Sequence, residues 1–516
     1  METGVPGQSN TAAEGLLGTT TAADLKQRSV RGGVAAVLGQ GLTFVVQMGA
    51  TIVLARLLSP EDFGIQGMVF AMTGLLGLFR DAGLGVASVQ REVVTHEQTS
   101  TLFWINVAVG AILTMVAAAM APFLVSFYNE PRLLSVTLVS SVAFLFNSLA
   151  VQHRALLYRA TRFVAMATID VLTLALSATV GVSMAALGFG YWALIGMAVS
   201  GPMITAAAAW IAMPWRPGRP TRTSGVRSML HFGGALTFNT LVVYLAYNTD
   251  KILLGRFWGA EALGLYGRAY QLGNVPVQQL WSAIGNVAFP ALSRAQSDPE
   301  RLHRSFLKVY SVVISATILV TMSCAVFAEE IVHIVLGPKW SGAADVLRLL
   351  TPTILAFMLV NPFGWFLLAI GRVGRSVGIA LLIAPVVMLG VAAGLRGGPT
   401  GVALGFSTAM VLLIVPIIAW AKHGTGMTAR DCWNAAKPPL SAGAAAGAAG
   451  WLFKLACGSA LTPMPLLILG GALSLGVYAW ILLIVMGQKG LYIDLLSQVL
   501  HRQPPRTSED LGPASI

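Results

Sequence analysis

The chain has 516 residues, of which 56% are hydrophobic and only 10% are charged, and its formal net charge is +12. Soluble domains average roughly 25% charged residues, so this composition excludes an ordinary soluble protein. A high positive charge is also typical of nucleic-acid-binding proteins, and the positions of the basic residues decide whether it has that meaning here.

About fourteen apolar segments are long enough to cross a membrane, since a spanning helix needs about 20 mostly apolar residues. They are predicted at approximately 33–54, 63–79, 102–125, 133–151, 163–187, 190–213, 229–253, 264–290, 309–328, 346–370, 376–395, 399–421, 438–457 and 464–486. The sequence therefore predicts an all-α polytopic membrane protein.

The basic residues lie mainly on one side of this topology. With the N-terminus inside, 24 of the 33 Lys and Arg residues fall in cytoplasmic segments, and about five fall in outer loops. This bias follows the positive-inside rule and predicts that both termini are cytoplasmic. The charge is thus topological, and we expect no nucleic-acid partner.

The predicted spans divide the chain into two halves and two tails. We expect a disordered cytoplasmic tail before the first helix, two lobes of six helices joined by a Pro- and Arg-rich cytoplasmic linker, two further helices, and a cytoplasmic C-terminal tail. In order, the boundaries are 1–32, 33–213, 214–228, 229–421, 438–486 and 487–516.

Residues 52–67 (IVLARLLSPEDFGIQG) and 252–267 (ILLGRFWGAEALGLYG) read as two copies of one segment. Six residues of the first copy recur identically 200 positions later: Ile52, Leu54, Arg56, Glu61, Gly64 and Gly67. Internal repeats in membrane chains are typical of transporters, whose substrate site lies between the repeated halves. We expect the copies to occupy equivalent places at the outer ends of the first and seventh helices, where we favour pairing of Arg with Glu and turn formation over substrate contact.

Polar residues repeat at helical spacing on three of the predicted spans, which gives each helix one polar face. A polar face is penalised against lipid, so we predict that these faces line a water-filled central cleft between the halves, although hydrogen bonding between helices is the alternative for any single residue. The predicted substrate path consists of Gln40, Gln47, Tyr244, Asn248, Lys251, Arg268, Gln271, Asn274 and Gln278.

Ionisable residues inside spans are costly and are therefore functional candidates. Asp170 is the deepest acid, and we weigh a proton- or cation-coupling site against a partner for a neighbouring helix. Asp250 and Lys251 lie toward the outer end of their helix, where a local ion pair is the alternative to ligand contact. Lys251 and Arg268 are our candidates for attracting a diphosphate.

The sequence contains no pattern that points to an enzyme or a cofactor. Cys324, Cys432 and Cys457 lack the spacing of a disulfide framework or a zinc site, and the seven histidines are scattered. No G-x-x-x-x-G-K-[ST] nucleotide loop occurs. We therefore expect no catalytic residue, metal or cofactor, and energy from an ion gradient, from the substrate gradient or from a partner.

The repeated segments resemble the two signatures of Wzx-type polysaccharide flippases, members of the multidrug/oligosaccharidyl-lipid/polysaccharide exporter superfamily. The resemblance runs from about residue 30 to 425. Its motifs are RLLSPEDFGIQGM (56–68), RDAGLGVASVQRE (80–92), NTDKILLGRFWGAEALGLYGRAYQLGNVP (248–276) and FPALSR (289–294).

The resemblance implies two six-helix lobes around a central cavity, plus two further helices, in a bacterial inner membrane. It implies flipping of undecaprenyl-diphosphate-linked oligosaccharide for capsule, exopolysaccharide or lipopolysaccharide synthesis. Membrane lipid, a polysaccharide polymerase with export machinery, and a proton or sodium ion are the further partners to expect. The alternatives are a drug or cation antiporter of the same superfamily, which should have more acidic cavity residues, and a membrane-embedded polymerase or ligase, which should have larger outer loops.

Overall fold

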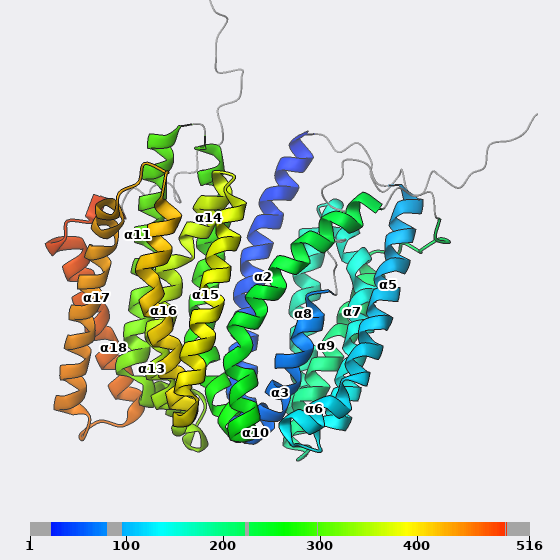
Figure 1. Ribbon diagram of the computed structural model, residues 1–516, viewed down its shortest axis with the longest axis horizontal. Helices are drawn as coiled ribbons and strands as arrows, with labels where there is room; N and C mark the ends of the chain where they lie inside the picture. Colours follow the sequence, from blue (N-terminus) through cyan, green and yellow to red (C-terminus); the bar gives the residue numbers. More distant parts are fainter. Residues whose placement is uncertain (1–21, 80–94, 222–226, 297, 491, 493–516) are drawn as a thin grey trace, which may run out of the picture. The chain divides into compact units, whose positions relative to one another are not determined.

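The computed structural model describes residues 22–79, 95–221, 227–296, 298–490 and 492, and every regular element in these ranges is a helix (Figure 1). The motif at 80–92 and most of both predicted tails, 1–21 and 493–516, lie outside the described residues. The expectation of an all-α chain is confirmed.

Each predicted span overlaps one of the helices. The first half contains α2 (Ala22–Leu57), α3 (Pro60–Gly77), α5 (His96–Ala119), α6 (Ala121–Tyr128), α7 (Leu133–Arg159), α8 (Phe163–Ala186) and α9 (Tyr191–Ala212). The remainder contains α10 (Arg227–Arg294), α11 (Pro299–Val326), α12 (Ala328–Val335), α13 (Gly342–Val360), α14 (Pro362–Ala369), α15 (Val373–Gly394), α16 (Gly398–Lys422), α17 (Ala429–Cys457) and α18 (Pro463–Trp480).

Within the described residues, 10 helical segments are long and apolar enough to cross a membrane. One of them, Gly378–Lys422, contains parts of both α15 and α16. A multi-pass membrane protein is therefore confirmed, while the number of fourteen spans stays a prediction. The helix α2 begins at Ala22, well before the predicted start of the first span at 33.

The first of two compact units comprises residues 1–271, 332–346 and 380–409. In it α2 packs on α8, α8 on α9, and α7 on both α5 and α9 (Figure 1). One buried cluster joins α3 to α6, α7, α9 and α10, and its large members are Ile65, Met68, Leu124, Leu133, Ile195 and Leu263. This cluster fixes the start of α3 against the second copy of the repeat.

The second unit comprises residues 272–331, 347–379 and 410–516. Its helix α17 packs on α11 and on α18. The core there includes Ile318, Ala442 and Tyr478, and the Tyr478 hydroxyl donates to the carbonyl of Ser315 at 2.9 Å. The predicted lobe boundaries stay a prediction.

Candidate functional site

Both copies of the repeat place a break between two helices at the same position. The helix α2 ends at Leu57, and Ser59 caps α3 with its side chain, which accepts from the backbone N–H of Asp62. In α10 the break falls at Gly259, 200 positions after Ser59, and its φ of 80° is one that glycine adopts without strain. The predicted equivalence of the copies is thus confirmed for their position relative to the break.

The two breaks are in direct contact through glycines. A Cβ atom added at Gly64 would overlap the carbonyl oxygen of Ala260, and one added at Gly264 would overlap the carbonyl oxygen of Pro60. Because position 60 corresponds to 260 and position 64 to 264, the contact is reciprocal, as at a two-fold axis. Glycine Cα–H groups that face carbonyl oxygens of a neighbouring helix are a known feature of close helix contacts.

The charged residues of the repeat do not pair with each other as expected. Arg56 donates to the carbonyl of Ile334 at 2.8 Å, and Glu61 forms an ion pair with Arg132. The guanidinium of Arg256 lies 5.8 Å from the ring centroid of Phe127. The expected Arg–Glu pairing is wrong because the end of α6, the start of α7 and the end of α12 lie beside the breaks and supply other partners.

Two aromatic side chains complete the contact at the first break. The indole of Trp340, fully buried, donates to the carbonyl of Ala55 at 2.8 Å. Its ring centroid lies 5.3 Å from that of Phe63 in an edge-to-face arrangement. The guanidinium of Arg268 also lies over the Phe63 ring, 3.8 Å from its centroid. The stack holds Arg268 beside α3.

Three predicted path residues on α10 lie within one local network. The hydroxyl of Tyr244 donates to the carbonyls of Phe70 and Ala71 on α3 at 3.2 and 3.1 Å. Asn248 donates to the carbonyl of Tyr244 at 2.9 Å and accepts from the ammonium of Lys251 at 3.0 Å. The Lys251 ammonium also lies 5.2 Å from the ring centroid of Tyr270. The half-buried lysine is therefore held by a neutral amide and an aromatic face.

The remaining path residues on α10 follow the break. Arg268 donates a hydrogen bond to the side chain of Gln271, and both side chains are half-buried in the first unit. Asn274 is half-buried and Gln278 is exposed, and these two belong to the second unit. Sequence spacing thus indicated a polar face on α10. In the structure, hydrogen bonds connect Tyr244, Asn248 and Lys251 in one group and Arg268 and Gln271 in another.

The path residues of the first helix lie on α2, where Gln40 is exposed and Gln47 is half-buried. On α8, Asp170 is half-exposed and forms an ion pair with Arg154 of α7 at 2.7 Å. A carboxylate with a basic partner on the neighbouring helix favours the helix-partner interpretation of Asp170.

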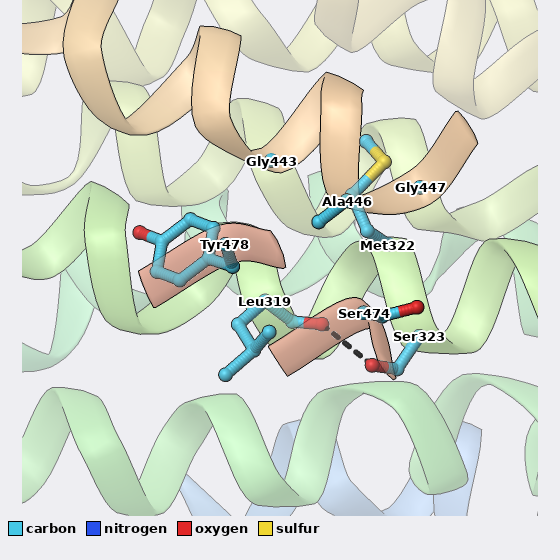
Figure 2. Close-up of a pocket in the computed structure, with 8 residues that line it drawn as sticks. All are labelled: Leu319, Met322, Ser323, Gly443, Ala446, Gly447, Ser474 and Tyr478. Carbon is cyan, nitrogen blue, oxygen red and sulfur yellow. Dashed lines mark hydrogen bonds between the residues drawn. The ribbon is translucent and has the colours of Figure 1, made fainter. Parts of the chain in front are cut away.

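A small pocket in the second unit is of a different kind. It lies between α11, α17 and α18, as Figure 2 shows, and its lining is formed by Leu319, Met322, Ser323, Gly443, Ala446, Gly447, Ser474 and Tyr478. Its cavity volume is about 10 Å³, which is about enough for one water molecule. It is a packing defect where glycines bring helices together, and it is too small for a sugar or a lipid chain.

Sequence reasoning missed the aromatic partners of the polar residues. Phe63, Trp340, Tyr270 and Tyr266, whose hydroxyl donates to Asp250, give no separate signal in the sequence, because aromatic residues at helical spacing usually belong to the core. The repeat held a usable signal, since Gly64 and Gly264 are identical in both copies and mark where side chains have no room.

Comparison of the sequence with protein families gives a match over residues 53–345. The family is described as "Polysaccharide biosynthesis protein". The matched region contains both copies of the repeat, and its length is more than half of the chain.

Curated relatives are similar to this chain over about two thirds or more of its length. The lipopolysaccharide biosynthesis protein WzxC of Escherichia coli (strain K12) is 29% identical over 386 residues, which cover 73% of this chain and 76% of the relative. The teichuronic acid biosynthesis protein TuaB of Bacillus subtilis (strain 168) is 26% identical over 64% of this chain and 68% of its own. The succinoglycan biosynthesis transport protein ExoT of Rhizobium meliloti (strain 1021) is 23% identical over 66% of this chain and 68% of its own.

Solved structures share the fold. The lipid II flippase MurJ, in an inward closed conformation, aligns with a TM-score of 0.70 and 13% identity over 90% of this chain and 100% of its own. An inward-facing multidrug resistance MATE family transporter of the MOP superfamily aligns with a TM-score of 0.57 and 14% identity over 76% of this chain and 98% of its own. The resemblance to Wzx-type exporters that the sequence motifs indicate is confirmed, and the chain belongs to the polysaccharide biosynthesis protein family.

Proposed function

We propose that this protein flips undecaprenyl-diphosphate-linked oligosaccharide repeat units from the inner to the outer leaflet of a bacterial cytoplasmic membrane. The observation that carries the proposal is the family match over residues 53–345, which contains the paired repeats of a multi-pass helical chain. Among the relatives, ExoT is named as a transport protein of polysaccharide biosynthesis. The fold that MurJ shares supports a transporter architecture.

The physical task of such a protein is to replace water around a charged sugar head group. A diphosphate and its sugar hydroxyls are heavily penalised in hydrocarbon when they lack partners. The polar face of α10 supplies amides, hydroxyls and two cations along one helix, and we assign the transport path to this face. Lys251 and Arg268 are the cations that would attract the diphosphate.

The reciprocal contact between the repeated breaks supports a gating role for this end of the first unit. Gly64 and Gly264 meet through backbone atoms. The charged residues of the first copy, Arg56 and Glu61, are bonded to residues outside the repeat. Backbone contacts of this kind can separate without breaking an ion pair. We propose that they close the outer side while the head group enters from the cytoplasmic side.

The test is a cellular one that resolves the two leaflets. In the native host, loss of the protein should cause lipid-linked repeat units to accumulate in the inner leaflet, and re-expression should restore polymer outside the cell. Accumulation in the outer leaflet would instead indicate a polymerase or ligase and would contradict the proposal.

A further inference from the structure

The buried acid Asp250 has no role in the transport path as assigned above. Its residue is 2% exposed, and it lies on the arm of α10 that precedes the break at Gly259. Asp250 precedes Gly259 by nine positions, which correspond to about 13 Å along the helix at a rise of ~1.5 Å per residue. Asp250 therefore lies within the predicted span 229–253, three residues before its predicted outer end, and its side chain is enclosed by protein.

The carboxyl of Asp250 is held by neutral groups. The hydroxyl of Tyr266, which lies on the other arm of α10 and is fully buried, donates to Oδ2 at 2.7 Å. The backbone N–H of Lys251 donates to Oδ1 at 2.8 Å. The ammonium of Lys251 instead donates to Asn248, as described above. Among the described residues no ion pair includes Asp250.

This arrangement differs from that of the other intramembrane acid. Asp170 is half-exposed and forms an ion pair with the guanidinium of Arg154 at 2.7 Å. An ionised carboxylate that is buried without a bonded cation is strongly penalised, and protonation removes this penalty. The titratable groups around Asp250 in the described part of α10 are Lys251, Tyr244, Tyr266 and Tyr270. The three tyrosines are neutral and cannot balance the charge.

We propose that Asp250 is the proton-coupling residue of the transport cycle. In the conformation described here its carboxyl holds a proton on one oxygen, and Tyr266 fastens it across the break in α10. When the two arms separate, water reaches the carboxyl, the O–H bond breaks and the proton passes to that water. One proton is thus taken up and released per cycle, with no other change of bonds. The proposal rests on the proposed flipping function, because a proton couples only to a movement that occurs.

The first test measures the proton directly and needs no substrate. Infrared spectra of the full-length protein in vesicles of phosphatidylethanolamine and phosphatidylglycerol should show the C=O stretch of a protonated carboxyl near neutral pH. Asp250→Asn should lose this band, and the matched control Glu300→Gln, which removes an exposed acid on α11, should keep it. Tyr266→Phe should keep the carboxyl but shift the band, because the phenol hydrogen bond is lost. A band that persists unchanged in Asp250→Asn would overturn the proposal.

The second test measures coupling. In the same vesicles, translocation of a fluorescent undecaprenyl-diphosphate-linked oligosaccharide should change several-fold when a pH gradient is imposed on the wild-type chain or on Glu300→Gln. Asp250→Asn should lose this response at a matched protein level. A response equal to that of the wild type would overturn the coupling role. If the wild-type chain translocates no probe under any gradient, the proposed function fails, whereas the infrared difference still decides whether Asp250 holds a proton.

Discussion

Gly64 and Gly264 lie directly against each other, although they are 200 residues apart in the sequence. A Cβ atom on Gly264 would lie 3.2 Å from the backbone nitrogen of Gly64, and each glycine faces a carbonyl of the opposite copy. The reciprocal contact explains why both copies have glycine at this position. Each copy packs its glycine against a backbone carbonyl of the other copy, so neither has room for a side chain there.

This contact predicts the effect of adding one methyl group. Gly64→Ala and Gly264→Ala should each destabilise the protein by about 1–3 kcal/mol and reduce polymer export, because the added Cβ overlaps a carbonyl oxygen that belongs to backbone. Thermal unfolding in detergent and export from complemented cells measure the two effects.

Gly267→Ala is the matched control, since it lies in the same repeat and no atom is within 4 Å of its added Cβ. It should be neutral or slightly stabilising, because alanine restricts the unfolded chain. Equal behaviour of all three variants would show that the glycine contact has no importance for folding or transport.

The cations of α10 give a second prediction. Lys251→Ala and Arg268→Ala should each lower polymer export without preventing membrane insertion, because each removes a fixed positive charge from the proposed path. Lys339→Ala, at an exposed position in a segment predicted to be outside, should export normally. Export assays at matched protein levels check this, and normal export from the Lys251/Arg268 double variant would disprove the cationic part of the path.

Much of the fold could be predicted from the sequence. Each predicted span overlaps a helix, because long apolar runs have few other stable arrangements in a membrane. The repeat also predicted equivalent turns after the first and seventh helices, and the structure has breaks there at Ser59 and Gly259.

The partners of the charged residues could not be predicted in the same way. Helical spacing shows which side chains share a face, but it does not show which neighbouring helix lies opposite. Arg56 and Glu61 therefore seemed to be partners of each other, whereas Ile334 and Arg132 bond to them. For the same reason the burial of Asp250 against Tyr266 was missed, although both residues lie in one motif.

A third prediction concerns acid pH. Glu329 begins α12 between two predicted spans, and Lys454 and then Arg348 hold the pKa of its carboxyl below the ordinary value of 4.5. Because the folded-state pKa is lowered, ionised Glu329 stabilises the fold at neutral pH. That contribution is lost as the pH falls from the ordinary value through the lowered one.

Glu329→Gln should therefore lower the free energy of unfolding at neutral pH by about 0.5–1 kcal/mol, as expected for a solvent-screened pair. The difference from the wild type should disappear in strong acid. Thermal unfolding of both proteins across this pH range measures it, and a difference that grows on acidification would contradict the assignment.

A fourth prediction concerns topology and rests on the distribution of basic residues. Reporter fusions within the linker 214–228 and after residue 487 should report the cytoplasm, and a fusion within 329–345 should report the outside. An external signal from the linker would be incompatible with two six-helix halves of the same orientation.

The most direct test of the central claim is translocation by the purified protein alone. A fluorescent undecaprenyl-diphosphate-linked oligosaccharide is placed in both leaflets of vesicles that contain the full chain, and a reducing quencher is added outside. If the protein flips the probe, the quencher should also remove the fluorescence of probe molecules that began in the inner leaflet. Protein-free vesicles should keep about half of the signal, because the probe in their inner leaflet stays protected. Complete quenching that depends on the wild-type chain is the result expected, and equal protection with and without the protein would contradict the account.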